Sequence, residues 1–276
     1  MAGYLSQATG AALAGFIVQS YASYGAEFDG VTNVVRLYAL MGGICFIFYF
    51  MMRPENIEPD HGEIKAAVNC AGLEPSSVKT IVGLVALFML DAWGGAFIVQ
   101  SYLSFYYQEK YFLDFDKIGG FLFVCNIISG ISGILSSKIV GCIGPLATMI
   151  YTHLPSNLFL IAIALVNNST ASILLLMGRF CISQMDVPAR QTFVTLIVSK
   201  NERSAANGIT NVARSVGLAL GLAWNGFFMQ GNTESIIFSV PFLIAGGSKI
   251  IYDLLIGFFF LWCKKKEEDK SHQGMF

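Results

Sequence analysis

Charged side chains interrupt a part of the sequence that is otherwise apolar. The stretch RFCISQMDVPARQ, residues 179–191, holds Arg179, Asp186 and Arg190 between long runs of Leu, Ile, Val, Ala and Phe. A charge at mid-bilayer costs about 2.5 to 3.5 kcal/mol on insertion scales, so an ion in a membrane helix usually faces a partner or a water-filled cavity. These residues are therefore candidates for ion pairing, gating or substrate contact.

Two predicted helices each carry polar residues along one face. The helix expected over 171–198 has them at i, i+4, i+7 and i+11, and the helix expected over 206–229 has a similar face. The residues are Arg179, Ser183, Asp186 and Arg190 on the first helix, and Asn207, Asn211, Arg214 and Asn225 on the second. Gly217 and Gly221, at small-xxx-small spacing, permit close contact with a neighbouring helix. We expect the two polar faces to meet.

Asp186, Arg190 and Arg214 are predicted to form a charge cluster near the cytoplasmic side, with Asp186 between the two arginines. Pro188 has no N–H and crowds the carbonyl of Gln184, which predicts a bend between Asp186 and Arg190. A bend beside a charge cluster suits a gate that moves. The alternative is a static clamp that holds the two helices together.

Asp91 is a further intramembrane carboxylate. It precedes Gly94 and Gly95, which would let a neighbouring backbone approach it closely. A carboxylate at this depth is a candidate proton carrier. The alternative is a fixed ion pair with Lys249, although Lys249 and Asp253, at i and i+4, could also neutralise each other.

Composition indicates an integral membrane protein. Hydrophobic residues make up 55% of the 276 residues and charged residues 13%, whereas soluble domains have about 25% charged residues. The net charge of -1 gives no basic surplus for nucleic acid binding. The cysteines show no CxxC spacing and the histidines are dispersed, so no metal or cofactor is expected. No Ser/His/Asp set or nucleotide loop appears, and an enzyme is not expected.

The apolar residues gather into runs long enough to cross a bilayer, which needs about 20 residues of helix. The predicted fold is an all-α polytopic bundle of about eight transmembrane helices, near residues 4–26, 32–52, 79–106, 117–137, 145–166, 171–198, 206–229 and 236–263. The longest polar interval follows the second helix and reads as a linker.

Several segments resemble the major facilitator superfamily of secondary transporters, in a poorly characterised branch. They are LDAWGGAFIVQS at 90–101, THLPSN at 152–157, SQMDVPARQ at 183–191, NERSAANGITNVARSVG at 201–217 and PFLIAGGSKIIYD at 241–253. The family fold has two six-helix bundles, and this chain aligns as the fifth through twelfth helices. The first four helices are missing, which implies either a fragment or a degenerate relative.

The resemblance implies a division into four parts. Residues 1–52 would be the last two helices of the N-terminal bundle, 53–78 the central cytoplasmic linker, 79–263 the six-helix C-terminal bundle, and 264–276 a cytoplasmic tail. The helices implied to line the path supply the cavity or gate candidates Asp91, Gln100, Asn126, Asp186, Arg190, Asn211 and Arg214, with Pro188 beside the gate. Lys249, Asp253 and His153 would lie on supporting helices, and the resemblance argues against them as substrate contacts.

The function expected from these features is transport of a small molecule by alternating access, with Asp91 or Asp186 as a proton-carrying carboxylate. The arginines favour an anionic substrate. The alternative is a truncated, non-transporting membrane protein that acts through association with other chains. In either case the lipid bilayer is the surrounding medium.

The distribution of basic residues predicts that both termini are cytoplasmic. With the tail inside, ten basic residues fall in inside segments and three (Arg36, Lys110 and Lys117) in outside segments. A cysteine placed at position 115 or 168 should react with an impermeant reagent added from outside, and one at position 62 or 201 should not. The reverse labelling pattern would contradict this topology.

Overall fold

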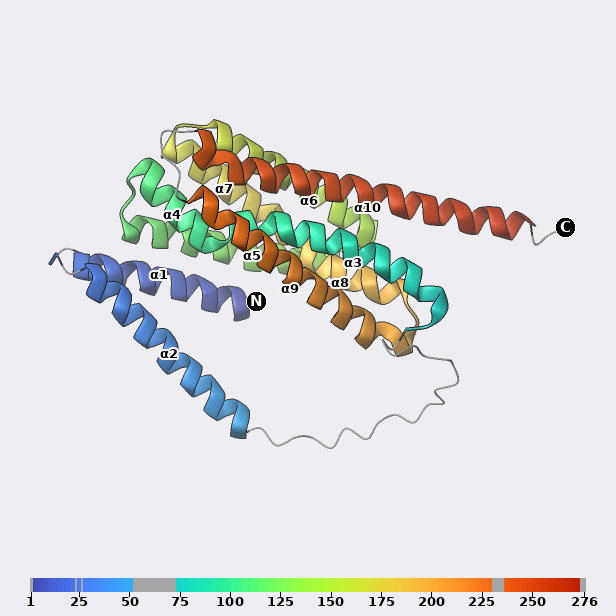
Figure 1. Ribbon diagram of the computed structural model, residues 1–276, viewed down its shortest axis with the longest axis horizontal. Coiled ribbons are helices and arrows are strands. Elements are labelled where there is room, and N and C mark those ends of the chain that lie inside the picture. The colour runs from blue at the N-terminus through green and yellow to red at the C-terminus, as the bar shows by residue number, and fades with distance from the viewer. Residues whose placement is uncertain (1, 23, 26, 52–72, 230–235, 274–276) are drawn as a thin grey trace.

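The polypeptide is helical in nearly every part that the computed structural model describes, namely residues 2–22, 24–25, 27–51, 73–229 and 236–273 (Figure 1). No strand occurs within these ranges, and the all-α prediction is confirmed. In chain order the elements are α1 (Ala2–Ala22), α2 (Glu27–Met51), α3 (Pro75–Gly95), the 3-10 turn η1 (Ala96–Ile98), α4 (Gln100–Tyr111), α5 (Phe115–Ile143), α6 (Pro145–Leu165), α7 (Ser169–Ser183), α8 (Asp186–Ile197), η2 (Lys200–Glu202), α9 (Arg203–Phe228), η3 (Ile236–Ser239) and α10 (Val240–Gln273).

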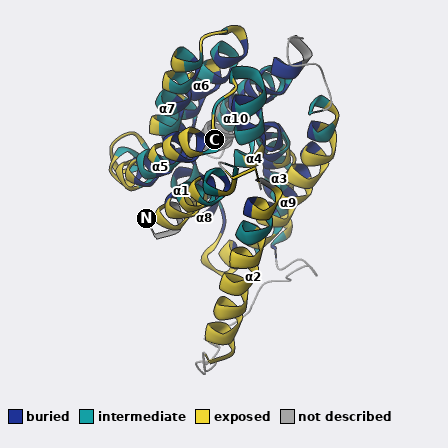
Figure 2. Cartoon of the chain, turned by 90° about the vertical axis from the view of Figure 1, so that its left-hand side faces the viewer, coloured by how far each residue is buried: buried dark blue, intermediate teal, exposed yellow. Residues whose placement is uncertain are grey.

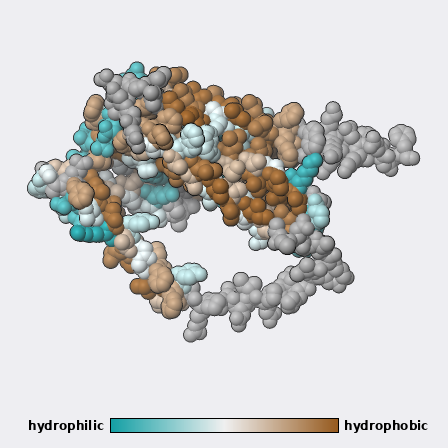
Figure 3. Space-filling model, viewed as in Figure 1, coloured by the Kyte–Doolittle hydropathy of each residue, from teal (hydrophilic) through white to brown (hydrophobic). Residues whose placement is uncertain are grey.

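Five helical segments in the described ranges are long and apolar enough to cross a membrane: Phe28–Met51, Ser77–Tyr111, Phe115–Ile143, Pro145–Leu165 and Val240–Phe260. Brown, hydrophobic residues dominate the face shown in Figure 3, and the strongest teal lies near the two ends of the bundle. All eight predicted segments contain helix, but the count of eight spans stays a prediction.

The predicted helix over 79–106 is interrupted. Val99 is extended (φ -62°, ψ 155°), and it separates η1 from α4. The side-chain amide of Asn225 on α9 donates to the carbonyl of Ala96 at 3.2 Å. This bond supplies a partner for a backbone group beside the break, as membrane-buried backbone requires.

The predicted helix over 171–198 is also interrupted, but not at the predicted bend. The break falls at Gln184 and Met185, before Asp186, and Pro188 is the third residue of α8. Backbone N–H groups in the first turn of a helix have no intrahelical partner, so proline is tolerated there. The bend expected between Asp186 and Arg190 is therefore wrong, because the chain begins a new helix in place of bending one.

Glycines bring α9 against α3. The small-xxx-small spacing predicted a close helix contact, and the structure shows that the partner is α3. A Cβ added at Gly217 would collide with the carbonyl oxygen of Met89, and one at Gly221 would lie 2.5 Å from the carbonyl oxygen of Trp93. Backbones at this separation gain close van der Waals contact, which drives helix association in lipid.

Glu202 fastens the beginning of α3 to the turn before α9. One carboxylate oxygen accepts the backbone N–H of Glu74 at 2.5 Å, and the other accepts the hydroxyls of Ser77 at 3.0 Å and Ser199 at 2.8 Å. Burial raises the pKa of Glu202, but these hydrogen bonds lower it by more, so the net pKa lies below the usual value. The carboxylate therefore stays ionised and accepting at neutral pH.

The two N-terminal helices differ in their contacts. α1 packs on α5 through glycines, because a Cβ at Gly15 would lie 2.6 Å from the carbonyl oxygen of Phe115 and one at Gly119 2.9 Å from that of Ala11. α2 leaves this pair and projects away from the bundle, exposed along most of its length (Figures 1 and 2).

Two helices in the structure extend past the predicted domain limits. α3 begins at Pro75, so part of the predicted linker 53–78 is already helix, while residues 52–72 lie outside the described residues. α10 continues to Gln273, so helix also covers most of the predicted tail, 264–276.

Substitution of Gly217 should show that the α3–α9 contact needs glycine. Gly217→Ala should lower the free energy of unfolding by about 1–3 kcal/mol, because the added methyl group overpacks the contact. Gly208→Ala is the matched control on α9, since a Cβ there meets nothing within 4 Å. Alanine should stabilise the helix there by up to about 1 kcal/mol. Thermal unfolding in detergent should separate the two variants, and equal melting temperatures would contradict the interpretation.

Candidate functional site

One carboxylate on α3 receives three cationic side chains from three other helices. Lys249 of α10 donates to Asp91 Oδ1 at 2.5 Å, while Arg214 of α9 and Arg190 of α8 donate to Oδ2 at 2.8 and 3.2 Å. Asp91 is 2% exposed. We call Asp91, Arg190, Arg214 and Lys249 the Asp91 cluster.

The cluster corrects the predicted arrangement of the arginines. Arg190 and Arg214 do converge, as expected, but the acid between them is Asp91 and not Asp186. Among the described residues, Asp186 accepts from Arg190 alone, at 2.7 Å, and the two residues are one helical turn apart on α8. The predicted ion pair of Asp91 with Lys249 is confirmed, and the pair of Lys249 with Asp253 is wrong.

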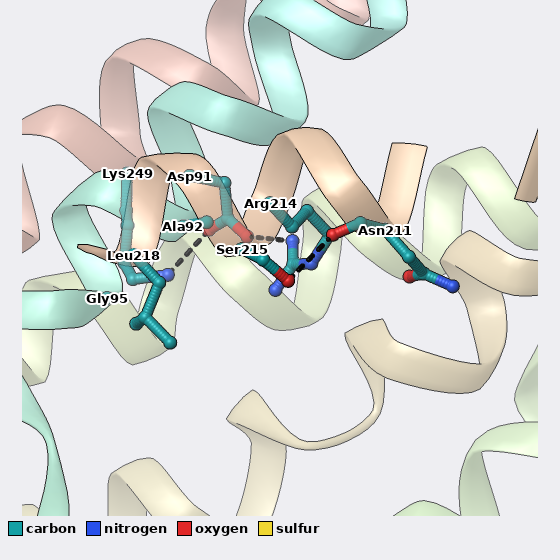
Figure 4. A pocket seen from close by; sticks show the side chains of 8 residues that line it. All are labelled: Asp91, Ala92, Gly95, Asn211, Arg214, Ser215, Leu218 and Lys249. Carbon is teal, nitrogen blue, oxygen red and sulfur yellow. Dashed lines mark hydrogen bonds and ion pairs between the residues drawn. The ribbon is translucent and has the colours of Figure 1, made fainter. Parts of the chain in front are cut away.

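A cavity of about 420 Å³ opens beside the Asp91 cluster (Figure 4). Its walls come from α3, α9 and α10, and it is lined by Asp91, Ala92, Gly95, Asn211, Arg214, Ser215, Leu218 and Lys249. The predicted cavity residues Asp91, Asn211 and Arg214 thus meet in one place. The side chain of Arg214 remains 28% exposed while it holds Asp91.

Lys249 also lines the cavity, contrary to its expected place on a supporting helix. Gly94 and Gly95 explain its position. A Cβ at Gly94 would collide with the Ser248 hydroxyl, and one at Gly95 would lie 3.7 Å from Lys249 Nζ. The two glycines therefore let α10 approach α3 closely enough for the lysine to reach Asp91. The Gly-Gly pair after Asp91 was the sequence signal for this approach, but it did not identify the partner helix.

Two predicted cavity residues lie elsewhere. Gln100, the first residue of α4 after the Val99 break, lines a separate groove against α1. Asn126 is buried and donates to the carbonyl of Leu122 on its own helix at 2.9 Å. Neither residue lines the cavity beside Asp91, and their role in a transport path stays a prediction.

A second polar group adjoins the Asp91 cluster. Asp253 on α10 pairs with His153 Nδ1 at 2.8 Å and accepts from the amide of Asn157 at 2.9 Å, both on α6. The other ring nitrogen of His153, Nε2, lies 3.8 Å from Asp91 Oδ1. The imidazole therefore stands between two carboxylates.

Arg179 of α7 belongs to the predicted polar stripe but was not among the predicted cavity or gate residues. It is 7% exposed, and its Nε has no hydrogen-bond partner. The sequence predicted that the arginines lie on one polar face. It did not predict which of them would pair with a carboxylate. Among the residues that the structure describes, no group of three His, Cys, Asp or Glu side chains is placed to hold a metal.

The chain is similar in sequence to a membrane protein whose role is not defined. The chain is 26% identical over 190 residues to the uncharacterized membrane protein YJR124C of Saccharomyces cerevisiae. This chain is a multi-pass membrane protein. The similarity covers 68% of it and 42% of the yeast protein, so the chain spans less than half of that relative's length. No protein-family model matches the chain.

Removal of the central acid should be costly. Asp91→Asn would leave Arg190, Arg214 and Lys249 without their shared carboxylate, and breaking a buried pair in this way costs about 3–5 kcal/mol. The double variant Asp91→Asn, Lys249→Met should recover part of the loss, because one unpaired cation is removed. Thermal unfolding of the purified variants measures both effects, and a wild-type melting temperature for Asp91→Asn would contradict the central role of Asp91.

Proposed function

We propose that the chain transports a small molecule by alternating access, as a secondary transporter of the major facilitator type. The observation that carries the proposal is the cavity beside Asp91, whose walls on three helices bear charges within a membrane bundle. Such charges are expensive in lipid and usually mark a substrate or ion pathway. Substrate sites between helices of a membrane bundle are typical of secondary transporters.

Arg190 is the proposed gate residue. It donates to Asp186 on its own helix and to Asp91 on α3, at 2.7 and 3.2 Å. The interruption before Asp186, with Pro188 in the new first turn, gives α8 a place to pivot. Opening would then separate Arg190 or Arg214 from Asp91, while the Asp186–Arg190 pair travels with α8. In the static-clamp alternative, these pairs would never separate.

We place the proton-coupling role on Asp253 and His153. Asp91 and Asp186 were the candidates from sequence, but Asp91 is held by three cations that stabilise its negative charge. Asp253 instead pairs with the imidazole of His153 at 2.8 Å, and imidazole is the side-chain type that commonly serves as a proton shuttle in proteins. The carboxylates of Asp91 and Asp186 lie within electrostatic range of Asp253, and Tyr252 packs against the ring of His153.

The exposed apolar surface of α2 favours a second candidate function. Within the described part of the chain, α2 packs against α1 near one end, and the rest of α2 offers a large face to lipid or to other helices (Figure 2). A membrane protein that acts through association with other chains would use such a face and would need no pathway.

Filling the cavity tests transport directly. Proteoliposomes containing the chain would be loaded with a mixture of small metabolites, and efflux would be followed by mass spectrometry. Leu218→Trp places a large side chain in the cavity wall and should abolish efflux. Leu220→Trp is the matched control, because Leu220 is 53% exposed on the same helix and does not line this cavity.

The outcomes separate the two candidate functions. Efflux that is lost with Leu218→Trp and kept with Leu220→Trp supports transport through this cavity. Asp253→Asn should then keep efflux but lose uphill uptake driven by a pH gradient. Efflux no greater than in empty liposomes would reject transport and favour the association candidate.

A further inference from the structure

Two buried polar atoms of opposite kind lack a hydrogen-bond partner near Arg190. Within the described part of the chain, the hydroxyl of Tyr252 on α10 and the carboxylate oxygen Oδ1 of Asp186 on α8 make no hydrogen bond. Both side chains are buried. A buried polar group without a partner is costly, above all in a membrane bundle, because lipid offers no hydrogen bonds. An unpaired donor and an unpaired acceptor in one region therefore require a physical reason.

The two groups are neighbours of the same guanidinium. The ring of Tyr252 lies 6.3 Å from the ring of Phe88, and the guanidinium carbon of Arg190 lies 5.6 Å from the centre of that Phe88 ring. The Tyr252 hydroxyl lies beside the guanidinium without completing a hydrogen bond to it. Asp186 accepts from the guanidinium through Oδ2, at 2.7 Å. Arg190 therefore brings the unpaired donor and the unpaired acceptor into one region.

Arg190 cannot satisfy the hydroxyl of Tyr252. A guanidinium only donates, so the hydrogen of that hydroxyl needs an acceptor elsewhere. Among the carboxylates within electrostatic range of the hydroxyl, Asp186 has the largest effect. Its Oδ1 accepts no hydrogen bond from the described residues, since Arg190 uses Oδ2. The unpaired donor and the unpaired acceptor thus match each other, and a short relative movement of α8 and α10 would join them.

The helix that bears Asp186 is the one with a place to pivot. The interruption between α7 and α8 stands directly before Asp186, so a pivot there moves its carboxylate. α10 is held on both sides of Tyr252, to α3 by Lys249 and to α6 by Asp253. Movement of α8 therefore changes the distance between Asp186 and Tyr252 while α10 stays in place.

We propose that Tyr252 holds α8 in the second position of the gate. When α8 pivots and Arg190 leaves Asp91, the hydroxyl of Tyr252 donates a hydrogen bond to Oδ1 of Asp186. The new bond offsets part of the loss of the Arg190–Asp91 contact, so the two positions differ less in free energy than they would without it. The proposal rests on the gate and the transport function proposed above, and it makes Tyr252 a positioning residue for them.

Thermal unfolding in detergent separates this role from a purely structural one. In the position shown the Tyr252 hydroxyl has no acceptor, so Tyr252→Phe should melt at or above the wild-type temperature. Tyr102→Phe is the matched control, because Tyr102 is equally buried and its hydroxyl donates to the carbonyl of Phe238 at 2.8 Å. The control should melt at a lower temperature. A loss of stability in Tyr252→Phe as large as in Tyr102→Phe, or a failure to fold, would overturn the proposal.

Thiol labelling measures the second position of α8 directly. Ala189 on α8 is fully buried in the position shown, so a cysteine there should react with N-ethylmaleimide only when α8 moves. Tyr252→Phe should slow this labelling about tenfold, because the loss of a hydrogen bond to a carboxylate depopulates the moved position. Ala206→Cys, equally buried on α9, is the control, and Tyr252→Phe should leave its labelling rate unchanged. The mass of the peptide that carries the new cysteine reports the reaction.

The results of labelling distinguish this proposal from the transport function. A labelling rate at Ala189→Cys that Tyr252→Phe leaves unchanged would overturn the role of Tyr252, whether or not the chain gives flux. Equal slowing at Ala206→Cys would overturn it as well, since it would show a general change in local opening. No labelling of Ala189→Cys would overturn both the moving gate and the role of Tyr252. Slowing at Ala189→Cys alone, together with no flux, would support Tyr252 as the residue that holds α8 and would reject transport.

Discussion

The electrostatics of Asp91 constrain the arrangement of the bundle. A carboxylate with 2% exposure must have its charge compensated, and three helices supply the cations that do so. Because each cation comes from a different helix, the ion pairs fix α8, α9 and α10 relative to α3. Packing then has to bring the backbones close enough for these side chains to reach one oxygen pair.

Small residues make that approach feasible. Gly94 and Gly95 admit α10, while Gly217 and Gly221 admit α9, and in each case a Cβ would lie against atoms of the opposing helix. Apolar burial gives little drive for association inside a bilayer, since lipid is as apolar as the helix surface. Close packing and polar pairing are therefore the forces that hold this bundle together, and both converge around Asp91.

The sequence was sufficient for the features that depend on local composition and spacing. The helical fold, the polar faces of the helices bearing Arg190 and Arg214, and the contact at Gly217 follow from periodicity and residue size. The ion-pair partner of each charged side chain could not be predicted from the sequence, because Asp91 and Asp186 are chemically equivalent and lie 95 positions apart in the chain. Tertiary packing decides which of them lies between the arginines. The breaks at Val99 and Met185 were missed because apolar runs on either side have a continuous helical pattern.

Three sets of contacts join α3 to α9. Glu202 ties their first turns, Gly217 and Gly221 bring the middle sections into backbone contact, and Asn225 binds the carbonyl of Ala96 at the far end. Because the two helices are in contact at both ends and in the middle, they resist both sliding along each other and separating at one end. The pair α3 and α9 should therefore move as one rigid unit. Bending near this pair would then occur at the helix interruptions, which lie at Val99 and at Gln184 and Met185.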